Sequence, residues 1–171
     1  HRLKGSEWDP WEWMLMRAAR CRLVAMRDGL TARGLRRHGV QALAPGNPMM
    51  DGLAYGDVPA SLGRCRRVLL LCGSRIPEAL RNFRRLLDGV SRLKGDQPIA
   101  VLVAVGSQPS LDQLEPILHD QQFRRGLPPS DQLDAAACWV KGPLLVLIGV
   151  KRFQTWASWA EAGVATAGTA T

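Results

Sequence analysis

The chain has 171 residues, of which 46% are hydrophobic and 22% are charged, and its formal net charge is +8 at pH 7. This balance is typical of a folded globular chain and argues against intrinsic disorder. No apolar run reaches the roughly 18 residues that a membrane-spanning helix needs. The chain opens at His1 on mixed, polar residues, so we expect no signal peptide and interpret both ends as cuts in a longer protein.

The basic surplus lies in the first half of the chain. Residues 1–37 carry nine basic and four acidic side chains, residues 38–95 carry the same numbers, and residues 96–171 carry five and seven. Such a surplus suits nucleic acid, an anionic membrane or a phosphate-bearing substrate, and it equally suits a solvated face. The three histidines and four cysteines show no metal-ligand spacing. We therefore expect no metal site, and reduced thiols.

The first fifty residues alternate between short helical and strand patterns. The expected order is helix 8–19, strand 22–26, helix 29–38 and strand 40–44. Asp9 can cap the first helix and Pro10 fits its first turn, while Asp28 can cap the second helix. The tryptophans, methionines and arginines of the first helix suit either packing on a domain or contact with a membrane surface.

A stretch rich in glycine and proline, with little periodicity, follows at residues 51–64. We predict one domain over residues 1–52, a linker over 53–64 and a second domain over 65–171. In the second domain, continuous apolar runs indicate strands buried on both faces. The expected elements are strand 68–72, helix 77–93, strand 99–105, helix 111–123, strand 144–148, helix 152–161 and strand 164–167. This alternation predicts an α/β fold, a parallel sheet with helices on both faces.

Ligands of an open parallel sheet bind beyond the carboxyl ends of its strands. Three segments follow predicted strands there: Gly46-Asn47-Pro48-Met49-Met50-Asp51, Gly73-Ser74-Arg75 and Gly168-Thr169-Ala170-Thr171. In the last two, glycine allows close approach of the backbone to an anion, and hydroxyl and helix-start N–H groups can donate to it. Arg75 adds a planar fork that can bind two oxygens. Each turn alone is also ordinary loop chemistry, but their placement predicts a phosphate site.

Motifs along nearly the whole chain carry a family resemblance. They are Pro10-Trp11-Glu12, Arg27-Asp28-Gly29-Leu30-Thr31-Ala32, Gly39-Val40, Gly46 to Leu53, Leu69 to Arg75, Pro77-Glu78-Ala79, Asn82 and Ala167 to Thr171. In this order and spacing, the chain resembles the lipid-A-disaccharide synthase-related proteins. The most specific motifs are the run from Gly46 to Asp51 and Gly73-Ser74-Arg75. Cys72 stands where that family usually has a proline.

The resemblance implies part of a GT-B glycosyltransferase, in which two Rossmann-like domains face a cleft. It implies that the second domain holds a UDP-sugar donor through residues 73–75 and 168–171, without a metal or cofactor. The cleft would receive Gly46, Asn47, Pro48, Met49 and Asp51 from the first domain. The resemblance also implies that the chain is an internal fragment of such an enzyme, with the catalytic base upstream of His1. We therefore expect this fragment to be inactive in glycosyl transfer.

Two other functions are open at this point. One is a UDP-sugar epimerase on the same fold, and the other is a non-catalytic protein that binds surfaces through its basic charge. Few aromatic residues are interleaved with the basic ones, so we expect no nucleic-acid partner. The expected reduced cysteines favour a cytoplasmic protein. A lipid acceptor and peripheral attachment to a membrane stay open. Arg81 is predicted on the solvent face of helix 77–93 and outside the donor site.

Overall fold

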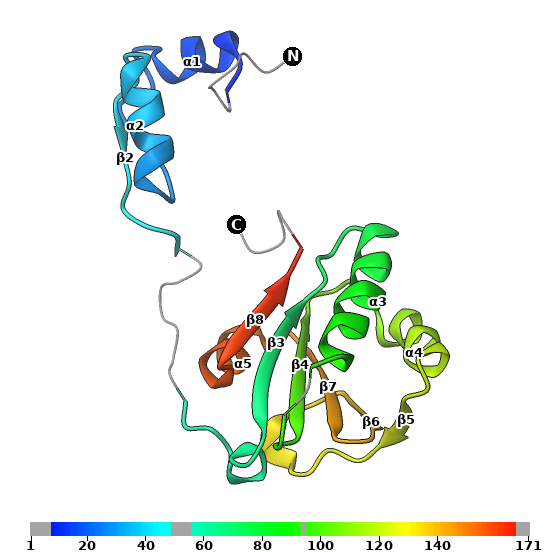
Figure 1. The fold of residues 1–171 in the computed structure, drawn as a ribbon. Helices are drawn as coiled ribbons and strands as arrows, with labels where there is room; N and C mark the ends of the chain where they lie inside the picture. Colours follow the sequence, from blue (N-terminus) through cyan, green and yellow to red (C-terminus); the bar gives the residue numbers. More distant parts are fainter. Residues whose placement is uncertain (1–7, 49–55, 94, 167–171) are drawn as a thin grey trace. The chain divides into compact units, whose positions relative to one another are not determined.

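The computed structural model describes residues 8–48, 56–93 and 95–166. The chain divides into two compact units, His1–Gly52 and Leu53–Thr171, and each is considered by itself. Their strands belong to separate sheets, one with two strands and one with six (Figure 1). Within the described residues, no helix combines the length and apolar character needed to cross a bilayer.

The first unit is a small α/β arrangement in which an aspartate caps the start of each helix. Its elements are α1 (Pro10–Met16), β1 (Val24–Ala25), α2 (Gly29–Arg37) and β2 (Ala42–Leu43), and the two strands pair in parallel. Asp9 and Glu12 form a capping box at the start of α1. Asp28 accepts hydrogen bonds from the backbone N–H and the hydroxyl of Thr31, both at 2.8 Å, and these bonds lower the pKa of its carboxyl. The caps therefore begin both helices where the sequence predicts, although α1 is shorter than residues 8–19.

The core of the first unit is small and leaves apolar side chains exposed. Its buried residues are Ala32, Leu35, Val40 and Ala42. Trp13 packs against this cluster and stacks on His38, with ring centroids 3.8 Å apart. Trp11 and Met14, on the same helix as Trp13, are 57% and 67% exposed. The helix thus packs through one face only.

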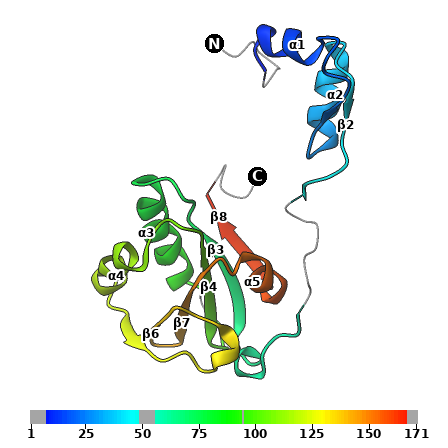
Figure 2. The same ribbon diagram turned by 180° about the vertical axis from the view of Figure 1, so that it is seen from behind.

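The second unit is a six-stranded sheet in the order β5-β6-β7-β4-β3-β8 (Figure 2). Its elements, in chain order, are the 3-10 helix η2 (Ala60–Leu62), β3 (Arg66–Leu71), α3 (Glu78–Ser91), β4 (Ile99–Val105), α4 (Leu111–Asp120), β5 (Arg124–Gly126), the 3-10 helix η3 (Asp131–Leu133), β6 (Ala137–Lys141), β7 (Leu144–Val150), α5 (Phe153–Trp159) and β8 (Ala162–Ala165). Strands β7, β4, β3 and β8 are mutually parallel. The predicted α/β class and the parallel centre of the sheet are confirmed.

The predicted parallel sheet lacks two strands at one side, β5 and β6, which pair antiparallel. Strand β6 pairs antiparallel with both β5 and β7. Only Gly142 and Pro143 separate β6 from β7, and Gly142 has a φ of +54°. A connection of two residues can only return the chain antiparallel, because a parallel partner needs a crossover of a dozen or more residues. The glycine–proline turn therefore sets the direction of this edge.

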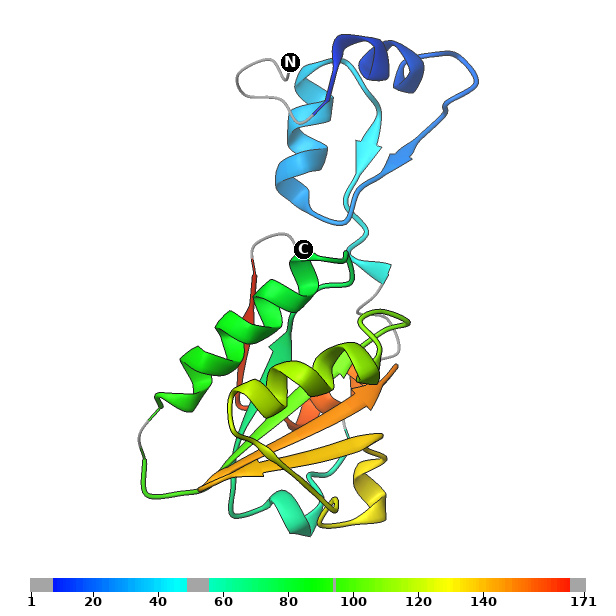
Figure 3. The ribbon, with the colours of Figure 1, turned by 90° about the vertical axis from the view of Figure 1, so that its right-hand side faces the viewer.

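Helices cover both faces of the sheet, as predicted (Figure 3). On one face, α3 and α4 contribute Phe83, Leu87, Leu114 and Leu118 to a cluster with alternate residues of the strands. On the other face, α5 and the two 3-10 helices contribute Trp156, Trp159, Leu62 and Leu133. In β4, Val101 and Val103 face the first cluster and Ala100 and Leu102 face the second. The central strands are thus buried on both faces, which explains their unbroken apolar sequence.

A substitution at Gly149 of β7 can test how tightly α5 packs on the sheet. A Cβ built on Gly149 would lie 2.5 Å from Cη2 of Trp156, whose ring is fully buried. The ring is held in place because its Nε1 donates to the carbonyl of Leu133 at 3.2 Å. We expect Gly149→Ala to lower the free energy of unfolding by about 1–3 kcal/mol, measured by urea denaturation.

Gly163→Ala is the matched control, since a Cβ at this exposed position in β8 meets no atom within 4 Å. We expect its free energy of unfolding to stay within about 0.5 kcal/mol of the parent. Equal values for the two variants would contradict the packing described for Trp156.

Candidate functional site

The carboxyl edge of the sheet brings together two segments that are far apart in the sequence. Strands β3 and β8 pair in parallel, with Leu71 opposite Ala165. The turn that follows β3 and Thr166, which follows β8, therefore open at the same edge. Residues 168–171, the second predicted donor segment, lie outside the described residues. On the β8 side of the site, Thr166 is thus the last residue that the structure describes.

The turn after β3 is shaped by Gly73 and leads directly into α3. Gly73 has a φ of +88°, a conformation that L side chains rarely adopt. The N–H of Ala79 donates to the carbonyl of Arg75 at 2.8 Å, which ties the turn to the first helical turn. The N-terminal end of a 14-residue helix thus adjoins the turn. The helix dipole favours an anion at this position, while the N–H groups of Ala79 and Arg81 already donate to the carbonyls of Arg75 and Pro77.

Asn82 joins the two segments. Its side-chain Nδ2 donates to the carbonyl of Cys72 at 3.2 Å and to the hydroxyl of Thr166 at 3.1 Å. The first bond fixes α3 against the end of β3, and the second fixes it against the end of β8. The sequence places Asn82 only among the family motifs, because a pattern of apolar residues does not show what a side-chain amide binds.

A pocket of about 590 Å³ lies at this edge. The residues around it are Cys72, Gly73, Ser74, Arg75, Glu78, Ala79, Arg81, Asn82, Arg85 and Thr166. Three of them are arginines and one is an acid. Arg81 forms an ion pair with Glu78 at 3.1 Å, whereas the described residues provide no ion pair for Arg75 or Arg85. The pocket therefore carries two uncompensated positive charges.

Arg81 and Arg85 were not predicted to belong to this site. The side chain of Arg81 is 58% exposed, as a solvent-facing position implies, yet it lines the same pocket as Arg75. The helical pattern assigns a face to each Cα, but a long arginine side chain reaches beyond it. The spacing of four residues between Arg81 and Arg85 is the signal that points to one shared face.

The segment predicted for an interdomain cleft is described only in part. Gly46, Asn47 and Pro48 follow β2 in the first unit, and Gly46 has a φ of +115°. Met49 and Asp51 lie outside the described residues. The glycine thus provides a backbone conformation that other residues rarely adopt.

Cys72 lines the pocket but is not a nucleophile at neutral pH. The residue is 1% exposed, and burial raises the pKa of its thiol to about 11. Within the described part of the chain, no group of three or more His, Cys, Asp or Glu residues could hold a metal ion. The side-chain functional groups around this pocket are three guanidinium groups, two hydroxyls, the amide of Asn82, the buried thiol of Cys72 and the carboxylate of Glu78.

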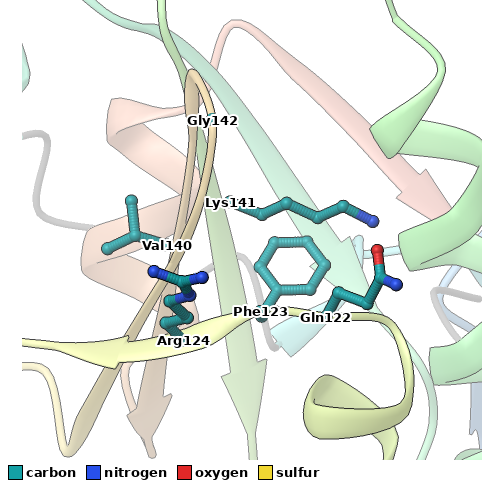
Figure 4. A pocket seen from close by; sticks show the side chains of 6 residues that line it. All are labelled: Gln122, Phe123, Arg124, Val140, Lys141 and Gly142. Atoms are coloured by element: carbon teal, nitrogen blue, oxygen red, sulfur yellow. The ribbon is translucent and has the colours of Figure 1, made fainter.

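A second concavity, of about 730 Å³, lies at the opposite edge of the sheet (Figure 4). Lys141 ends β6 there, opposite Leu144 at the start of β7. The Nζ of Lys141 donates to the carbonyl of Gln121 at 2.7 Å and sits 5.5 Å from the ring centroid of Phe123. Gln121 is the C-terminal cap of α4, where a cation is stabilising. Lys141 thus has a structural role, because its ammonium group binds the C-terminal end of α4.

Comparison with known proteins finds no family model, no curated protein and no solved structure that matches this chain.

The bridge made by Asn82 can be tested by removing its amide. Asn82→Ala deletes both hydrogen bonds, so we expect the free energy of unfolding in urea to fall by about 1–2 kcal/mol. Ser91→Ala, on the same helix, removes only a bond from Ser91 Oγ to the carbonyl of Leu87, and we expect little change. A loss below about 0.5 kcal/mol for Asn82→Ala would show that the bridge contributes little.

The state of Cys72 can be tested by alkylation at pH 8. Raising the thiol pKa from 9.0 to about 11 lowers the thiolate fraction roughly 100-fold, and burial adds a steric barrier. We expect iodoacetamide to modify half-buried Cys65 well before Cys72 in the native protein, as followed by peptide mass spectrometry. In urea the two rates should converge. Equal rates in the native protein would refute the closed environment of Cys72.

Proposed function

We propose that the second unit is the donor-binding domain of a glycosyltransferase and that its carboxyl edge holds the diphosphate of a UDP-sugar. The observation that supports this most is the pocket at the end of β3. It combines a glycine turn, the N-terminal end of α3 and the unpaired guanidinium of Arg75. Each of these favours a phosphate group. The family resemblance of the same residues points to the same ligand.

The proposed chemistry is transfer of a sugar from the UDP-sugar to a hydroxyl of the acceptor. The acceptor oxygen forms a bond to the anomeric carbon while the bond from that carbon to the diphosphate breaks. The electron pair of the broken bond stays on the diphosphate, which leaves as UDP, and the acceptor proton passes to a base. Arg75 and the backbone N–H groups would stabilise the negative charge that develops on the leaving group. Arg75 and these N–H groups would act on the departing diphosphate only, and not on the acceptor.

Ser74 has a supporting role in the same proposal. It follows Gly73 in the turn and is exposed, so its hydroxyl is accessible and can donate a hydrogen bond to a phosphate oxygen. Thr166 belongs to the same rim and is joined to the turn through Asn82. The acceptor, including a lipid acceptor at a membrane surface, would approach from outside the pocket described here.

Arg75→Ala tests this assignment. Loss of a charge-assisted contact should weaken binding of UDP by about 1.5–3 kcal/mol, which is roughly 10- to 150-fold in Kd. Isothermal titration of the 171-residue chain with UDP measures this directly.

Arg92→Ala is the matched control for Arg75→Ala. Arg92 lies beyond the C-terminal end of α3, where it pairs with Asp88 and is far along the chain from the pocket. Its removal should leave the Kd for UDP unchanged within about twofold. Equal effects of the two substitutions, or no binding of UDP by the parent chain, would remove the proposal.

A further inference from the structure

Arg85 is a second unpaired guanidinium in the pocket of Arg75. Both residues line the pocket, and the described residues include no ion-pair partner for either. They reach it from different parts of the chain: Arg75 from the turn before α3, and Arg85 from the eighth residue of the helix. Two positive groups thus approach one pocket from separate positions.

The position of Arg85 is supported by an apolar groove beside the pocket. This groove, of about 410 Å³, runs between α3 and α4 and is lined by Leu80 and Ile117 together with three arginines and a glutamine. Arg85 lines both the groove and the pocket. The hydrocarbon stem of an arginine packs favourably on an apolar surface while its charged head stays in water. Because Arg85 lines both hollows, its stem can pack on the groove while its head reaches the pocket.

The neighbouring arginine behaves differently. Arg84 pairs with Asp120 of α4 at 2.8 Å, and it lines the groove but not the pocket. Arg81 is in the pocket but is partly neutralised by Glu78. Among the arginines of α3 that line the pocket, Arg85 is thus the one whose charge the described carboxylates do not compensate.

We propose that Arg85 is a specificity-determining residue that binds a second phosphate group, so that the pocket selects a nucleoside diphosphate over a monophosphate. This inference rests on the proposed function. Arg75 and the glycine turn contact one phosphate of the ligand, and Arg85 contacts the other. A ligand with a single phosphate occupies the Arg75 side and leaves Arg85 in solvent.

The test compares UDP with UMP by isothermal titration on the parent chain and on Arg85→Ala, Arg84→Ala and Arg75→Ala. We expect Arg85→Ala to weaken UDP about tenfold and UMP less than about twofold, so the preference for UDP falls by about fivefold to tenfold. Arg84→Ala should leave both affinities within about twofold of the parent. Arg75→Ala should weaken both ligands. Arg85→Lys, which keeps the charge but loses the planar fork, should recover part of the preference.

Three results would overturn the inference. If Arg85→Ala weakens UDP and UMP equally, the residue adds only general attraction. If Arg85→Ala changes the Kd of neither ligand while Arg75→Ala weakens binding of UDP, the inference about Arg85 fails and the proposed function survives. If the parent chain binds neither ligand, both fail together. Thermal unfolding of each variant, followed by circular dichroism, confirms that an exposed substitution leaves the fold intact.

Discussion

The parallel pairing of β3 with β8 is the constraint on which the candidate site depends. The two strands are far apart in sequence and are tied at both ends. At the amino end, Arg67 forms an ion pair with Glu161 at 2.5 Å, and its Nε donates to the carbonyl of Trp159 at 2.8 Å. At the carboxyl end, the amide of Asn82 joins the backbone of Cys72 to the hydroxyl of Thr166. Because both ends are fixed, the turn beyond β3 and Thr166 beyond β8 are held at one rim.

The described side chains give this rim a positive charge. The glycine turn leads into the start of α3, and Arg75 and Arg85 add charge that the described carboxylates do not neutralise. Such an arrangement has a cost in self-repulsion, which an anionic ligand removes on binding. The opposite edge of the sheet differs, because Lys141 is already bound to the end of α4. The contrast between the two edges supports the carboxyl edge as the site of the proposed phosphate chemistry.

The sequence predicts the buried part of this fold well and its exposed side poorly. Strands β3, β4 and β7 and helix α3 follow from apolar runs and a clear helical period, because both signals come from burial. Strand β5 was missed because Arg-Arg-Gly at residues 124–126 has no apolar pattern. Strand β6 was missed although Ala137, Cys138 and Trp139 are apolar and buried, and its antiparallel direction comes from the two-residue turn at Gly142. At the site, residues 73–75 were identified from their place after a buried strand. Arg85 was missed because pattern analysis follows Cα positions and not the reach of a long side chain.

We propose that the carboxyl edge of the six-stranded sheet binds a nucleoside diphosphate, and amide chemical shifts measured during a titration with UDP test this proposal most directly. We expect shifts that saturate with UDP at the backbone amides of Gly73, Ser74 and Arg75 and at the side-chain amide of Asn82. We expect no change at Lys141 and Gly142, which lie at the other edge. Saturable shifts confined to the amino edge, or no saturable shift at residues 73–75, would contradict it.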